Sequence, residues 1–63
     1  MQRSTHSLQG AFSGTIEVSK TADGKFQANS LNHPHLTWKG DTEQLAIERA
    51  REQLTEKALK GEI

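Results

Sequence analysis

The sequence contains no cysteine among its 63 residues. No disulfide can therefore form, and a thiolate-bound metal site is excluded. Hydrophobic residues are also scarce, at 32% of the chain, which is below the usual share of a globular domain. A chain this short with so little apolar surface has a marginal core. We expect it to gain burial by self-association or by binding another protein.

Charge of one sign and long apolar runs are missing as well. Eight basic and eight acidic residues cancel, so no bulk electric field attracts the chain to nucleic acid or to a membrane. No apolar run approaches the roughly 20 residues of a membrane span. The first ten residues lack the apolar segment of a secretory signal. These observations predict a soluble cytoplasmic protein.

Three segments alternate between apolar and polar residues with a period of two, which indicates strands with one buried face. They cover residues 12–18, 25–31 and 36–39. The pair Asp23-Gly24 suits the tight turn of a hairpin, and Pro34 marks residues 32–35 as a loop. Residues 1–10 have no usable periodicity and are expected to be a flexible tail or the frayed start of the first strand. The residues predicted to face the core are Phe12, Gly14, Ile16, Val18, Phe26, Ala28, Leu36 and Trp38.

Helical periodicity begins directly after Gly40 and predicts a helix over residues 42–60, ended by Gly61. Asp41 or Thr42 is its expected N-cap, and an Asp41 cap would form a capping box with Gln44. The predicted apolar stripe consists of Ile47, Ala50, Leu54 and Ala58. Residues 11–63 are thus expected to form one α+β domain, a three-stranded antiparallel β-meander packed by one C-terminal α-helix, ordered β-β-β-α.

Signatures of catalysis are absent from the sequence, which has no cysteine nucleophile and no glycine-rich phosphate loop. His33 and His35 flank Pro34, but structural metal sites normally need four converging ligands, so a solvated loop is the simpler interpretation. Glu48, Glu52 and Glu56 follow a spacing of four, which is typical of a solvated helix face. We therefore expect a protein that is not an enzyme and that needs no cofactor or metal.

The expected way of working is contact with a protein partner or with a second copy of the chain. A sheet of this kind offers strand edges for pairing and a polar outer face. We predict homodimerisation through an edge or through that face, with the basic flank of the helix as a second candidate surface. The candidate partner-binding residues are Thr15, Glu17, Gln27, Asn29, Thr37 and Lys39 on the sheet, and Arg49, Gln53, Lys57 and Lys60 on the helix.

Nucleic-acid binding is the alternative, because β-β-β-α is also the second part of the double-stranded-RNA-binding fold. That family contacts phosphates partly through basic residues at the start of its final helix. The corresponding turn in this chain, residues 41–44, contains Asp41 and Glu43 and would repel phosphate. The first helix of that family has no counterpart in residues 1–10. We therefore rank RNA or DNA binding below protein contact.

The order of motifs from residue 14 to residue 60 resembles the N-terminal domain of HicB-type antitoxins. The matching positions are the turn Asp23-Gly24, then Pro34 and Leu36, the joint Gly40-Asp41-Thr42, and the helix residues Ala46, Ala50 and Leu54. The resemblance implies an HicB-like fold. It also implies self-association and the inhibition of a partner, which in that family is a small RNA-cleaving toxin.

The sequence departs from the family pattern in two places. Residues 32–35 are Asn-His-Pro-His where the family commonly has an acidic residue, proline, glycine and small residues, and Trp38 replaces a smaller side chain. Family antitoxins usually continue into a C-terminal DNA-binding segment, which has no counterpart in residues 1–63. The resemblance therefore implies partner binding and does not extend to operator binding.

Overall fold

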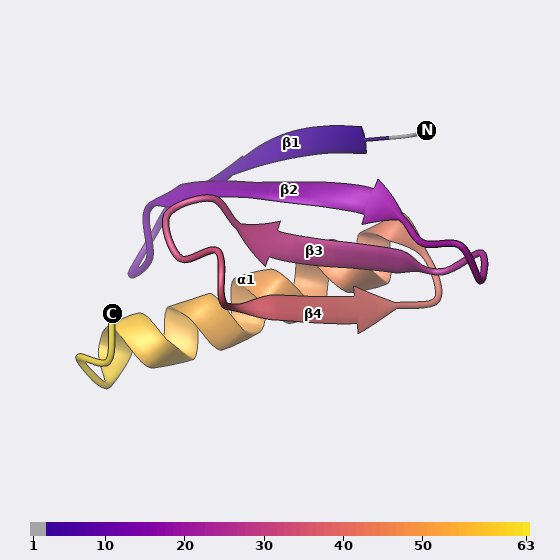
Figure 1. Ribbon diagram of the computed structural model, residues 1–63. Coiled ribbons are helices and arrows are strands. Elements are labelled where there is room, and N and C mark those ends of the chain that lie inside the picture. The colour runs from indigo at the N-terminus through magenta and orange to yellow at the C-terminus, as the bar shows by residue number, and fades with distance from the viewer. Residues whose placement is uncertain (1–2) are drawn as a thin grey trace.

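Four antiparallel strands and one helix make up the computed structural model, which describes residues 3–63 (Figure 1). The strands are β1 (Arg3–Leu8), β2 (Gly14–Lys20), β3 (Phe26–Ser30) and β4 (Thr37–Gly40), and the helix is α1 (Glu43–Leu59). The sheet order is β1-β2-β3-β4, a simple meander. The predicted α+β class and C-terminal helix are confirmed, whereas the expected three strands are four.

The additional strand is β1, in the region where a flexible tail or a frayed strand start was expected. It pairs with β2 along its whole length, from Arg3 opposite Ser19 to Leu8 opposite Gly14. Only Leu8 of this strand is buried, so the segment carries almost none of the apolar alternation that identifies a strand in a sequence. Backbone pairing with β2 is what orders it. The remainder of the expected tail, residues 1 and 2, lies outside the described residues.

The β2–β3 hairpin turns where the Asp-Gly pair predicted it. The backbone N–H of Thr21 donates to Lys25 O (2.7 Å), and that of Gly24 donates to Thr21 O (3.1 Å). Gly24 has a φ of 85°, a conformation that side chains disfavour. The hydroxyl of Thr21 also donates to the Asp23 carboxylate, and this hydrogen bond lowers the pKa of Asp23 from its usual value.

Helix α1 packs against one face of the sheet, over β2, β3 and β4, and contacts β1 far less (Figure 1). Ile16, Val18 and Ala28 fill the sheet side of this interface. On the helix the fully buried residues are Ala46, Ala50 and Leu54, whereas Ile47 and Ala58 are only partly buried. At the N-terminal end of the helix the buried stripe therefore begins at Ala46, one residue before the predicted Ile47. Short alanine side chains allow the helix to lie close to the sheet.

Both ends of α1 are closed by specific hydrogen bonds. Thr42 is the N-cap, and its Oγ1 accepts from the backbone N–H of Leu45 at 3.1 Å. The capping box of Asp41 and Gln44 does not form, because Asp41 precedes the N-cap; its carboxylate pairs with Lys25 Nζ at 3.1 Å. At the other end Gly61 has a φ of 75° and donates to Ala58 O, so the predicted glycine stop is confirmed.

Alanine substitutions at Asp41 and Thr42 should show which of the two residues caps the helix. Thr42→Ala is expected to lower the free energy of unfolding by about 1 kcal/mol, because the Leu45 amide loses its acceptor. Asp41→Ala removes only an exposed ion pair and should change it by less than about 0.5 kcal/mol. Urea unfolding monitored by circular dichroism measures both, and a larger loss for Asp41→Ala would contradict the assignment of Thr42 as the cap.

Candidate interaction surfaces

The outer face of the sheet, on the side away from α1, gathers the six sheet residues singled out from the sequence. The strand register places Glu17 opposite Asn29, which in turn lies opposite Thr37. Lys39 and Gln27 form a second pair of neighbours. The four candidates on β2 and β3, which include Thr15, are half-buried, whereas Thr37 and Lys39 on β4 are exposed. The structure therefore brings these residues together on one polar face, and their role in binding stays a prediction.

The four candidates on the helix do not form an unpaired basic surface. Lys57 pairs with Glu62 (3.5 Å) and Lys60 with Glu56 (2.8 Å). The hydrogen bond from Lys60 lowers the pKa of the Glu56 carboxyl and raises the pKa of the Lys60 ammonium. Arg49 is turned toward the sheet, where its Nη1 donates to the backbone carbonyl of Lys39 at 2.7 Å. The two lysines are thus paired with carboxylates, whereas Arg49 keeps its positive charge and is held at the sheet by a neutral carbonyl.

The sheet has two edges, and the hydrogen-bond alternation of antiparallel strands shows which backbone groups each edge presents. On β2, Thr15 O accepts from Leu31 N, so Thr15 bonds toward β3 and Ile16 bonds toward β1, where it lies opposite His6. The neighbours of His6 along β1, Thr5 and Ser7, therefore direct their N–H and C=O groups away from the sheet.

The same alternation describes the β4 edge. The backbone N–H of Ser30 donates to Leu36 O (3.3 Å), so Leu36 and Trp38 bond toward β3. Thr37 and Lys39 then direct their backbone groups outward. The bond from Arg49 to Lys39 O agrees with this direction. The β4 edge is thus partly occupied by a side chain of the same chain.

Each edge is accompanied by a groove that it forms with the helix. Between β4 and α1, a groove of about 420 Å³ is lined by Trp38, Arg49, Glu52 and Gln53. Between β1 and α1, a groove of about 330 Å³ has walls from both elements. Its lining residues are His6, Ser7 and Leu8 of β1 and Glu43, Gln44, Ile47, Glu48 and Arg51 of α1.

The groove beside β1 holds a polar cluster that the sequence did not reveal. The Ser4 hydroxyl donates to Glu43 Oε2 at 2.7 Å and lies 3.0 Å from His6 Nε2. Ser4 and His6 share the inner face of β1, where they alternate with Thr5 and Ser7. That period of two was present in the sequence, but it involved polar residues only and gave no contrast between the faces.

The arrangement of this cluster favours structure over catalysis. The serine lies between the histidine and the carboxylate, whereas nucleophilic activation requires the base between the nucleophile and the group that orients it. Within residues 3–63, no group of three or more histidine, aspartate or glutamate side chains is placed to hold a metal ion. The cluster connects the first turn of α1 to the inner face of β1.

No protein-family model matches the chain, and comparisons with curated proteins and with solved structures found no match. The HicB resemblance therefore stays a prediction from short motifs. No helix in the described part of the chain has the length and apolar character needed to cross a membrane.

Proposed function

We propose that this chain is a small, non-enzymatic interaction module that self-associates by pairing β1 with β1 of a second copy. The observation that carries the proposal is the difference between the two sheet edges. Within residues 3–63, no other strand pairs with the outer edge of β1, and the backbone groups of Thr5 and Ser7 point outward there. The β4 edge, by contrast, already has Arg49 bonded to Lys39 O.

The composition of β1 supports pairing at this edge. Natural edge strands are commonly protected by charged side chains, proline or a bulge. In β1 the charged Arg3 is at the first position, where it pairs with Glu17 of β2 (3.8 Å), and residues 4–7, Ser-Thr-His-Ser, contain no lysine, arginine or proline. The formal net charge of the chain is zero, so two copies approach without long-range repulsion. Two antiparallel β1 strands around a two-fold axis would form one continuous sheet and close the assembly as a dimer.

The register of such a pair follows from the outward groups. Placing Thr5 opposite Ser7 of the second copy lets both residues exchange backbone hydrogen bonds across the axis, with His6 facing its own counterpart. The inner side chains of the added strand would then cover the groove beside β1. Ile47, which is only partly buried, would lose further contact with water there, and this adds apolar burial to the backbone hydrogen bonds.

A proline substitution tests the proposal. In Thr5→Pro the lost N–H is one that points away from β2, so the fold should keep its ladder while the dimer loses a donor and meets the proline ring. We expect the wild-type chain to sediment as a dimer at micromolar concentration. The substitution should weaken self-association by about tenfold or more. Sedimentation velocity measures the association, and a circular dichroism melt confirms the fold.

The matched control is Thr37→Pro, which places the same residue type at an outward-pointing position of the other edge. It should leave the wild-type dimer unchanged. A wild-type chain that remains monomeric at the highest concentration would refute self-association. A dimer equally weakened by both substitutions would show that the contact is not at β1.

A second protein is the alternative partner for the same edge. The HicB resemblance suggests a small toxin-like protein, and strand addition accepts an extended segment of any chain that presents suitable side chains. A small basic protein encoded by the neighbouring gene would be tested for copurification with this chain. Copurification that is lost in Thr5→Pro and kept in Thr37→Pro would support this alternative.

Two features argue against the double-stranded-RNA alternative. In residues 3–63 the element before β2, β3 and β4 is a fourth strand of the sheet, β1, where that fold has its first helix. The first turn of α1 carries Glu43, which accepts a hydrogen bond from Ser4, and a carboxylate repels phosphate. A gel shift of duplex RNA at physiological salt that weakens as salt increases would reverse this ranking.

A further inference from the structure

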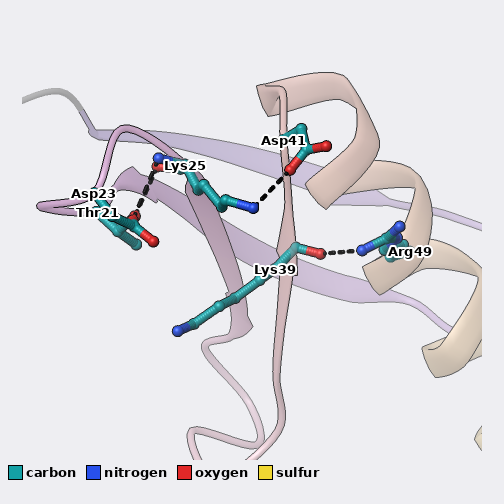
Figure 2. Close-up of polar contacts among 6 residues, drawn as sticks. All are labelled: Thr21, Asp23, Lys25, Lys39, Asp41 and Arg49. Carbon is teal, nitrogen blue, oxygen red and sulfur yellow. Dashed lines mark hydrogen bonds and ion pairs between the residues drawn. The ribbon is translucent and has the colours of Figure 1, made fainter.

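Arg49 lies at the β4 edge, which stays exposed in the proposed dimer paired through β1. It extends from α1 to β4, and Figure 2 shows its guanidinium directed at the backbone carbonyl of Lys39 while the Lys39 side chain points the opposite way. The Nη1–O distance of 2.7 Å is that of a strong charge-assisted hydrogen bond. The carbonyl it occupies is one of the outward groups that a new strand on β4 would need.

A chain that can pair through both edges of its sheet can assemble without limit. Pairing of β1 with β1 closes a dimer, but each copy in that dimer still presents its β4 edge at the outside of the continuous sheet. If β4 edges also paired, dimers would join into an open-ended sheet. Edge-to-edge growth of this kind is what natural sheets avoid by placing charge or bulk at their edges.

The β4 edge also offers burial to an incoming strand. Trp38 is only partly buried and forms one wall of the groove beside this edge. A strand added to β4 would cover the indole ring and remove apolar surface from water. A strand paired there with Arg49 in place would have to displace the guanidinium from the Lys39 carbonyl, and the strand would meet the charged Arg49 side chain beside its own backbone.

We infer that the β4 edge is a second surface for a copy of this chain and that Arg49 keeps it closed. The inference rests on the proposed function for its first half, the dimer at β1, but the closure of β4 can be measured separately. It assigns Arg49 a positioning role, because the guanidinium acts by occupying the Lys39 carbonyl.

The test combines two substitutions. In Arg49→Ala the carbonyl of Lys39 is released, and the fold should persist because Arg49 is exposed and alanine favours the helix. We expect the weight-average mass to rise at least about twofold above that of the wild-type dimer, since dimers now join through β4. In Thr5→Pro with Arg49→Ala, assembly should stop at a dimer paired through β4.

Lys57→Ala is the control, because it removes one positive charge from the same flank of α1 without touching β4. It should keep the mass of the wild-type chain. Arg49→Met, which carries no charge and cannot donate to the carbonyl but favours the helix, should reproduce Arg49→Ala and serves if the alanine variant does not fold. A wild-type mass for both Arg49 variants, each folded by circular dichroism, would overturn the inference.

The two proposals fail in different ways. If the wild-type chain is monomeric and Arg49→Ala forms dimers, self-association at β1 is refuted and the closure of β4 is supported. If the wild-type chain is a dimer and Arg49→Ala remains a dimer of the same affinity, the closure is refuted and the proposed function stands.

Discussion

Gly40→Ala is expected to remove about 3 kcal/mol of the free energy of unfolding, at the upper end of overpacking costs. A Cβ atom at Gly40 would lie 2.6 Å from Ala46 N and 3.0 Å from Leu45 C. Both are backbone atoms of the first turns of α1, so no side-chain rotation relieves the clash. A domain of this length has a total stability of only about 3 to 9 kcal/mol, so the substitution should remove between about a third and all of it and lower the urea midpoint in proportion.

Gly24→Ala provides the control for this prediction. Gly24 has a φ of 85° in the β2–β3 turn, and a Cβ there meets nothing within 4 Å. That substitution therefore costs only backbone strain, about 1 kcal/mol, whereas Gly40 has no positive φ and its cost is steric. Urea unfolding of both variants compares the two costs. A Gly40→Ala loss smaller than that of Gly24→Ala would mean that α1 moves away from β4 at little cost.

The parts of the fold that the sequence predicted are those encoded by neighbouring residues. The Asp23-Gly24 turn and the Gly61 stop each depend on a backbone conformation that glycine favours. The alternation of Ile16 and Val18 with polar residues is likewise local, and both side chains are buried. Such features can be identified without knowledge of distant contacts.

The features that the sequence did not predict depend on tertiary contacts. Strand β1 contributes only one buried apolar residue, Leu8, and is ordered by pairing with β2. The sequence left the cap open between Asp41 and Thr42, and the structure places the helix start at Glu43, so that Thr42 accepts from Leu45 while Asp41 pairs with the distant Lys25. Ala46 is buried because the helix meets the backbone at Gly40, a proximity that periodicity alone does not show.

The candidate surfaces also include one part that the sequence predicted and one that depends on tertiary contacts. The six polar residues of the outer sheet face follow from the period of two, and the register places them as neighbours. The contact between Arg49 and Lys39 O links helix to edge strand and has no counterpart in any sequence pattern. The sequence assigned Arg49 to the basic flank of the helix, whereas the structure shows that its side chain is bonded to the edge strand of the sheet.

Leu54→Ala should lower the free energy of unfolding by about as much as Gly40→Ala. Leu54 is 0% exposed, and the other two fully buried residues of α1 are alanines, so among the described residues it is the only large side chain that the helix buries completely. Its truncation loses the transfer free energy of the side chain and leaves a cavity in the core that also contains Ile16 and Val18, the largest fully buried hydrophobic side chains of the sheet. We expect a loss of about 3 kcal/mol, within the range measured for such substitutions.

Leu59→Ala is the matched control, because Leu59 belongs to the same helix and is 74% exposed. It should change the free energy of unfolding by less than about 0.5 kcal/mol. Both variants need to be measured at several protein concentrations, since a dimer paired through β1 would stabilise the folded state by mass action. Equal losses for Leu54→Ala and Leu59→Ala would contradict the packing of α1 on the sheet. A large loss confined to Leu54→Ala would support the burial of this side chain in the core between α1 and the sheet.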